Sequence, residues 1–165
     1  NYGRIMLTSS ASGIYGNFGQ SNYGAAKAAM VGFMNVLHHE GAKNNIRVNT
    51  LAPTAATRML EGLIPPQVAD LMAPELVTPG VLYLVSEDAP SKTILGAGAG
   101  CFSVAHIYET PAVFVGGAKA TVDDVAANWE KISNPQGELP IDAAFAQTNK
   151  YVAAAAEALG IKLGG

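Results

Sequence analysis

The sequence predicts an α/β fold built on a doubly wound parallel sheet, with a helical extension at its carboxyl end. Short apolar runs at residues 4–8 and 47–51 have the length of buried strands. Between them, residues 22–43 contain no proline and repeat apolar side chains at intervals of three and four, which is typical of a helix. A strand, a helix and a second strand in this order form a βαβ unit, whose strands lie parallel.

The segments around this unit are predicted from glycine and proline. Residues 9–21 are rich in serine and glycine and are expected to form a loop, and Pro53 is expected to end the second strand. Further on we expect a helix at 79–87 and a strand interrupted by glycines at 94–102. After a turn at Thr110 and Pro111 we expect another strand at 112–115. The apolar residues at 59–64, which follow a strand, are predicted to act as a lid.

Residues 119–165 have the pattern of a helical extension. Thr121 and Asp124 have the spacing of a capping box, and the helix that follows is expected to place Trp129 in the core. Residues 133–140 form a linker, and a second helix is expected at 141–159, ended by Gly160. We therefore expect two parts, residues 1–118 and residues 119–165, with the second packed on the same domain.

Composition excludes several classes of function. The chain has 165 residues, 49% of them hydrophobic and 14% charged, so a packed core is expected rather than disorder. The formal net charge is −3 and there is no basic run, which argues against a nucleic-acid partner. No apolar run approaches the ~20 residues of a membrane span, and the first residues lack the pattern of a signal peptide. A water-soluble protein is expected.

The cysteine and the histidines do not predict a metal site. One cysteine, Cys101, excludes an internal disulfide, and the three histidines do not combine with it in a zinc-ligand spacing. Cys101 is expected to be a small buried residue. His38 and His39 point in different directions on a helix, and we expect them to act as favourable charges at its carboxyl end.

Three polar residues indicate an active site. Tyr23 and Lys27 are four residues apart on the long helix, so their side chains lie on one face, one turn apart. A phenol, whose ordinary pKa is about 10, becomes an effective acid or base near neutral pH when a cation stabilises its phenolate. Ser10 follows the first strand, at the edge where parallel sheets bind ligands, and can donate a hydrogen bond to a substrate oxygen.

Three motifs in order give the chain a family resemblance. Residues 8–13 (TSSASG), residues 22–29 (NYGAAKAA) and residues 46–53 (IRVNTLAP) resemble the active-site half of short-chain dehydrogenases/reductases. The resemblance implies the carboxy-terminal half of a Rossmann-like sheet. It also implies that Ser10 orients the substrate oxygen, Tyr23 is the catalytic acid or base, and Lys27 stabilises its phenolate and contacts the nicotinamide ribose.

The resemblance implies NAD or NADP as cofactor. By motif position the cofactor-binding residues are Tyr23, Lys27, Pro53, Thr54 and Thr57, with Thr57 at the nicotinamide carboxamide. The family's glycine-rich phosphate turn has no counterpart in this sequence, because Gly96 to Gly100 come too late and have the wrong spacing. We therefore expect the natural polypeptide to continue upstream by on the order of 100 residues.

A narrower likeness comes from Pro53-Thr54, where the family commonly has Pro-Gly, together with residues 73–77 and 125–132. These segments resemble the dehydrogenase domain of peroxisomal type 2 multifunctional enzymes and its bacterial relatives. The likeness implies oxidation of a 3-hydroxyacyl-CoA to a 3-ketoacyl-CoA in fatty acid metabolism, in the cytoplasm of a bacterium or the peroxisome of a eukaryote. It also implies a homodimer or tetramer that packs through the long helix.

Three alternatives stay open. The first is a dehydrogenase for another secondary alcohol, such as a steroid or a sugar. The second, of a different class, is a non-catalytic assembly or acyl-binding module, which the missing phosphate turn would suit. The third, a serine hydrolase using Ser10, is disfavoured because no Gly-x-Ser-x-Gly elbow surrounds this residue.

Overall fold

A computed structural model describes residues 1–57 and 65–164 and divides the chain into two compact units, Asn1–Ala105 and His106–Gly165. The boundary between the units falls at Ala105 rather than at residue 118. The packing of the helical extension on the same domain stays a prediction. The lid predicted at residues 59–64 lies outside the described residues.

The first unit is built on a four-stranded sheet. Its strands are β1 (Gly3–Thr8), β2 (Ile46–Thr54), β3 (Ile94–Gly98) and β4 (Cys101–Ala105), in the spatial order β1-β2-β3-β4. β1 pairs with β2 in parallel, β2 with β3 in parallel, and β4 is antiparallel to β3. The predicted α/β class is confirmed, and so is the βαβ unit, because helix α2 (Ser21–Gly41) connects β1 to β2.

The expectation that Pro53 ends the second strand is wrong, because Pro53 pairs with Ala97 and the strand continues to Thr54. The Thr50 N–H donates to the Thr93 carbonyl on the β3 side of the strand. Because successive residues of a strand direct their N–H groups to opposite sides, the backbone nitrogen of Pro53 faces the β1 side. β1 ends at Thr8, opposite Leu51, so no strand lies beside that nitrogen. A proline is tolerated there because the hydrogen bond it cannot donate is not required.

The single strand expected at 94–102 is instead a hairpin. Gly98 pairs with Cys101, so Ala99 and Gly100 alone form the turn. Both residues have positive φ, 52° and 72°, as the tight turns that suit a twisted hairpin require. Glycine adopts this conformation without strain, whereas alanine does so rarely, which is why the sequence did not reveal the turn.

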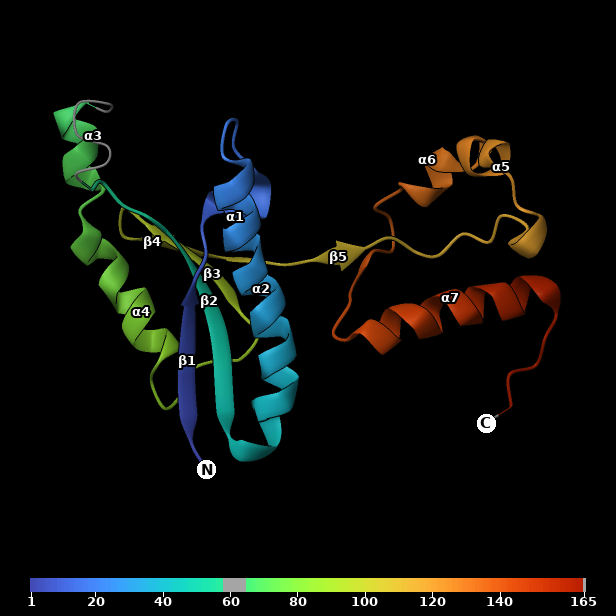
Figure 1. The fold of residues 1–165 in the computed structure, drawn as a ribbon, viewed down its shortest axis with the longest axis horizontal. Coiled ribbons are helices and arrows are strands. Elements are labelled where there is room, and N and C mark those ends of the chain that lie inside the picture. Colours follow the sequence, from blue (N-terminus) through green and yellow to red (C-terminus); the bar gives the residue numbers. More distant parts are fainter. Residues whose placement is uncertain (58–64, 165) are drawn as a thin grey trace. The chain divides into compact units, whose positions relative to one another are not determined.

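Helices cover both faces of the sheet (Figure 1). On one face Met34 of α2 packs with Val48 and Ile94. On the other face Leu51 and Leu95 pack against Val77 and Leu84, the latter in helix α4 (Thr78–Leu84). Two short elements precede α4, helix α3 (Pro66–Leu71) and the 3-10 turn Pro74–Val77. The sheet is therefore the middle layer of a three-layer unit.

The second unit combines helices with long irregular segments. Strands β5 (Tyr108–Glu109) and β6 (Leu139–Pro140) form a small antiparallel pair, and the helices are α5 (Val122–Ala127), α6 (Trp129–Ile132) and α7 (Ala144–Leu159). The capping box of Thr121 and Asp124 is confirmed, and the Thr121 hydrogen bonds lower the pKa of the Asp124 carboxyl. Gly160 ends α7 with φ 67°, as predicted.

Two expectations for this unit are wrong. Residues 112–115 form no strand, although they were predicted to do so. Trp129, expected in the core, is 61% exposed. A helical stripe of apolar residues predicts which side of a helix faces a neighbour, but it does not supply the neighbour. The helix also breaks at Asn128, whose amide side chain donates to the Asp124 carbonyl at 2.8 Å.

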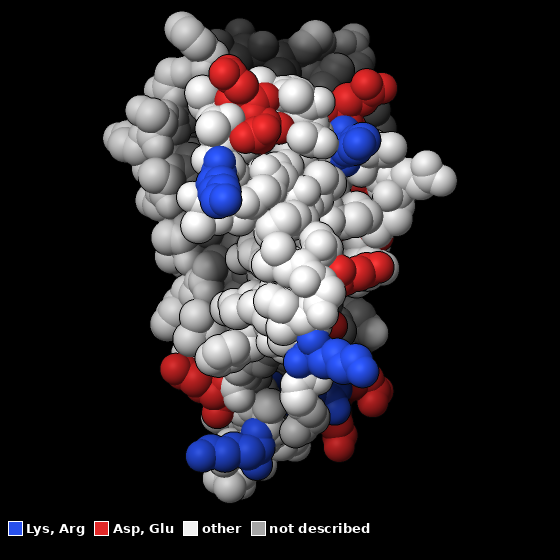
Figure 2. All heavy atoms as spheres, turned by 90° about the vertical axis from the view of Figure 1, so that its right-hand side faces the viewer, with Lys and Arg blue, Asp and Glu red and all other residues white. Residues whose placement is uncertain are grey.

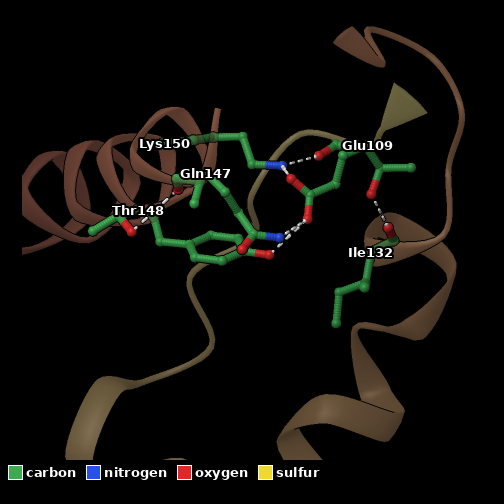
Figure 3. A network of polar contacts seen from close by, with 8 residues as sticks. Glu109, Ile132, Gln147, Thr148 and Lys150 are labelled. Carbon is green, nitrogen blue, oxygen red and sulfur yellow. Dashed lines mark hydrogen bonds and ion pairs between the residues drawn. The ribbon is translucent and has the colours of Figure 1, made fainter. Parts of the chain in front are cut away.

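A polar network ties α7 to the β5 strand (Figure 3). The Glu109 carboxylate accepts hydrogen bonds from Lys150 at 2.7 Å, Gln147 at 2.6 Å and Tyr151 at 2.9 Å. Lys150 also donates to the Thr110 carbonyl, and the Thr110 hydroxyl donates to the Ile132 carbonyl at the end of α6. One carboxylate therefore connects the strand with α7, and the residue after it reaches α6.

The network shifts the pKa values of its members. Hydrogen bonds from Lys150, Gln147 and Tyr151 lower the pKa of Glu109 from 4.5 to about 2. The same contact raises the pKa of Tyr151, because its hydroxyl proton is held by the carboxylate.

None of the helices in residues 1–57 and 65–164 combines the length and the hydropathy needed to span a membrane.

These contacts predict an acid-dependent stability. A lowered carboxyl pKa stabilises the folded state fully above pH about 4.5, and the effect is lost as the pH falls through about 2. Glu109→Gln is therefore expected to lower the urea midpoint of the second unit at pH 7, and to differ progressively less from wild type below pH about 4.5. Trp129, the one tryptophan of the sequence, lies in this unit and reports its unfolding by fluorescence.

Glu138→Gln is the matched control, since Glu138 lies exposed in the same unit and its backbone N–H bonds only the Pro135 carbonyl. It should leave the midpoint unchanged. Equal effects of the two substitutions at pH 7 would contradict the assignment of this stabilisation to the Glu109 network.

Candidate active site

The three predicted catalytic residues lie on two neighbouring elements. Ser10 comes two residues after the end of β1, and Tyr23 and Lys27 lie in the first two turns of α2. α2 packs beside β1 and β2, and α1 (Ala11–Tyr15) packs against α2. The carboxyl end of β1 is thus the place where the serine-bearing segment and the start of the long helix meet.

Ser10 begins a helix that the sequence did not predict. Residues 9–21 were expected to form a loop, but Ser10 caps α1, and its Oγ accepts the Ser12 N–H at 3.2 Å. A hydroxyl that accepts in this way still has its own proton to donate. The cap therefore fixes the side chain and leaves a hydrogen-bond donor available to a substrate oxygen.

Glycine permits α1 to lie close to α2. A Cβ on Gly13 would come within 2.7 Å of the Lys27 carbonyl carbon and the Lys27 Cβ, which no real side chain tolerates. Gly24 on α2 faces the Ser12 carbonyl in the same way, with a Cβ placed 3.1 Å from its oxygen. The two segments that bear Ser10 and Lys27 are therefore in direct backbone contact.

Lys27 lies between the strand and the tyrosine. Its Nζ donates to the Thr8 carbonyl at 3.0 Å and lies 5.8 Å from the centroid of the Tyr23 ring. Tyr23 is 44% exposed, and its backbone N–H donates to the Asn22 side chain at 2.8 Å. The Lys27 ammonium group therefore lies within cation–π distance of the Tyr23 ring.

A cavity of about 410 Å³ opens beside α1, where β2 and β3 end. Ala11, Tyr15, Thr54 and Met72 line it, together with the β3–β4 hairpin. Of the predicted cofactor residues Pro53, Thr54 and Thr57, Thr54, the last residue of β2, contributes to this lining. Pro53 lies in β2 and Thr57 is exposed beyond it, and neither is among the lining residues.

The sequence did not predict that the β3–β4 hairpin lines this cavity. Cys101 and Phe102 line the cavity, and Cys101 is exposed, not buried as predicted. Gly98 allows this hairpin to lie against β2, because a Cβ there would come within 2.7 Å of the Thr54 carbonyl oxygen. Gly98 therefore permits a close approach between the hairpin and β2, although the turn that follows it was not predicted.

The residues present fit one end of a nicotinamide dinucleotide. Lys27 uses one of its three N–H donors on Thr8, so donors remain for ribose hydroxyls. Tyr23 lies one turn away on the same helix. For a metal there is no such fit, since the residues 1–57 and 65–164 hold no group of three or more His, Cys, Asp or Glu placed to bind one.

The chain is similar to several known proteins. Residues 1–66 match the short chain dehydrogenase family. The peroxisomal multifunctional enzyme A of Dictyostelium discoideum is 41% identical over 135 residues, which are 81% of this chain and 30% of that protein. An acetoacetyl-CoA reductase of Acinetobacter is 45% identical over 95 residues, which are 52% of this chain and 38% of the reductase.

A solved structure is similar as well. Full-length peroxisomal multifunctional enzyme type 2 from Drosophila melanogaster superposes with a TM-score of 0.81 at 30% identity, covering 96% of this chain and 29% of that one. The chain is therefore similar to the short-chain dehydrogenase family over residues 1–66, and over most of its length it resembles peroxisomal multifunctional enzymes. It spans less than half of the length of each of these relatives.

Proposed function

We propose that this protein catalyses the NAD(P)-dependent interconversion of a secondary alcohol and a ketone, with a 3-hydroxyacyl-CoA as the alcohol. The observation that carries the proposal is the position of Lys27, held on the Thr8 carbonyl and 5.8 Å from the Tyr23 ring. This arrangement supplies a cation beside a phenol, next to the segment that bears Ser10.

The residues act on the substrate hydroxyl and its proton. Ser10, whose Oγ is oriented by the Ser12 N–H, donates a hydrogen bond to the substrate oxygen. Tyr23, as phenolate, accepts the hydroxyl proton during oxidation and returns it during reduction. Lys27 stabilises the phenolate, and its remaining N–H groups would hold the nicotinamide ribose. A bound nicotinamide dinucleotide accepts or supplies the hydride in this chemistry.

Two observations support an acyl-CoA substrate. The proteins to which this chain is similar include an acetoacetyl-CoA reductase and a peroxisomal multifunctional enzyme. The cavity beside α1 is lined mainly by apolar side chains and glycines, which suits a hydrocarbon chain better than a sugar. The choice between NAD and NADP stays open, because the ribose-reading acidic or basic residue belongs to the phosphate-binding half of the family.

We also propose a homodimer that packs through α2. Met34 is buried in the core and Leu37 packs against the same cluster, so neither is available to a partner. Phe33 and Val36, by contrast, are 52% and 55% exposed on this helix.

The surface in Figure 2 carries interspersed acidic and basic side chains, so this view offers no single-sign patch for a nucleic-acid partner. We propose a cytoplasmic location in a bacterium or a peroxisomal one in a eukaryote.

The dimer predicts that Phe33→Ser weakens self-association, because an exposed aromatic contact is removed from the interface. Sedimentation velocity at micromolar concentration should show a dimer for wild type and a larger monomer fraction for the variant. Leu82→Ser, on α4 and 62% exposed, is the control and should remain dimeric. A wild-type monomer at this concentration would refute the proposed assembly.

The catalytic role predicts that Tyr23→Phe lowers turnover at least ~10²-fold, because only the proton-transferring hydroxyl is removed. The measurement is steady-state oxidation of a 3-hydroxyacyl-CoA by the natural full-length protein with each nicotinamide cofactor. Tyr83→Phe removes a hydroxyl from an exposed tyrosine on α4 and should retain wild-type turnover.

Wild-type turnover in Tyr23→Phe would refute the site. Absence of activity in the wild type with both cofactors, across hydroxyacyl-CoA, steroid and sugar alcohols, would favour the alternative of a non-catalytic acyl-binding or assembly module.

A further inference from the structure

We propose that Ser9 is a positioning residue for Lys27, acting through the Lys27 backbone rather than through substrate or cofactor. The proposal rests on the dehydrogenase function proposed above and adds a residue to its machinery. Ser9 is only 2% exposed, and its Oγ donates to the Lys27 carbonyl at 2.8 Å. Ser10, its neighbour in the chain, is the residue expected to contact the substrate.

Ser9 is itself fixed to the sheet. Its N–H donates to the Leu51 carbonyl at 2.7 Å, which continues the β1–β2 hydrogen bonding one residue beyond the last strand residue, Thr8. The Ser9 hydroxyl therefore connects the carboxyl end of the sheet directly with the interior of α2. In a helix, a backbone carbonyl accepts a hydrogen bond from the N–H of the residue four positions later. Its oxygen has a second lone pair, which can accept the Ser9 hydroxyl.

Two consecutive residues, Thr8 and Ser9, hold Lys27 by its side chain and by its backbone. The carbonyl accepts from Ser9, and the ammonium group donates to the Thr8 carbonyl at 3.0 Å. The close contact of Gly13 with the carbonyl carbon and Cβ of Lys27 limits movement of the same turn from another side. Three contacts from the 8–13 segment thus converge on one residue of a helix of 21 residues.

The position of the Lys27 turn affects the stability of the Tyr23 phenolate. The stabilisation of a phenolate by an ammonium group falls with their separation, so it depends on where the Lys27 turn lies relative to β1. Without the Ser9 hydroxyl, the carbonyl is held only by the helix, and the Lys27 turn can move away from the Thr8 carbonyl. The phenolate of Tyr23 would then form at higher pH, although no atom of the reaction has been removed.

The test compares serine variants of the natural full-length protein. Ser9→Ala removes a donor and leaves the Lys27 carbonyl its helix hydrogen bond, so the fold should persist. We expect turnover at neutral pH to fall about 3- to 10-fold and the alkaline rise of the oxidation rate to move upward by roughly half a pH unit, with KM little changed. Ser9→Thr keeps the hydroxyl and should restore the wild-type profile.

Ser86→Ala is the matched control. Its hydroxyl also donates to a backbone carbonyl, that of Tyr83 at 2.9 Å, which belongs to α4 and not to α2. The profile of this variant should overlay that of wild type. If the added methyl group prevents Ser9→Thr from folding, Ser9→Cys, which keeps a weaker donor, should fall between Ser9→Ala and wild type.

The outcomes separate this proposal from the function on which it rests. A Ser9→Ala profile that overlays wild type, or turnover lowered equally at every pH, would overturn the positioning role while Tyr23→Phe remained inactive. An equal shift in Ser86→Ala would overturn it too. Wild-type turnover in Tyr23→Phe would instead overturn the proposed function.

Discussion

The packing of α2 against the parallel pair β1 and β2 is the interaction on which the rest of the first unit depends. Met34 of α2 is buried on Val48 and Ile94, and its sulfur accepts the Thr50 hydroxyl at 3.1 Å. This contact sets the rotation of the helix and so decides which residues face the sheet. Because Tyr23 and Lys27 lie two to three turns before Met34 on the same rigid helix, their position follows from the same contact.

The two ends of the sheet are stabilised differently. At the end opposite the site, Arg4 donates to the Ser86 and Glu87 carbonyls, and Arg47 donates to the Ala89 carbonyl. Asn49, fully buried, donates to the Pro90 carbonyl at 2.7 Å and accepts the Thr93 N–H at 3.1 Å. These side chains satisfy the backbone of the α4–β3 connection and hold that end of the sheet in place.

At the site end, close backbone contact replaces long side chains. Gly13 lets α1 lie on the Lys27 turn, and Gly98 lets the β3–β4 hairpin lie on Thr54. The cavity beside α1 is left between these two contacts. A ligand there would meet the small residues of β2 and β3 together with the larger side chains of Tyr15, Met72 and Phe102.

Local patterns predicted more of this molecule than long-range ones. The spacing of Tyr23 and Lys27 fixes their relation within one helix, so the sequence predicts it and the structure agrees. The β3–β4 hairpin was missed because its turn is Ala99-Gly100, and alanine is not a usual residue at positive φ. Trp129 was misplaced because its burial depends on whether another element covers α6, which no local pattern contains. The contact of Ser9 with Lys27 joins residues 18 apart in the sequence, and no motif reports it.

We propose that Lys27 acts on both the phenol and the cofactor, and the Lys27→Met variant is the sharpest test of this double role. The measurement is the pH profile of oxidation together with a cofactor titration, on natural full-length wild type, Lys27→Met and Tyr23→Phe. We expect Lys27→Met to move the alkaline rise upward by about one pH unit or more and to weaken cofactor binding roughly tenfold, whereas Tyr23→Phe leaves binding intact. A Lys27→Met profile and cofactor affinity that overlay those of wild type would contradict it.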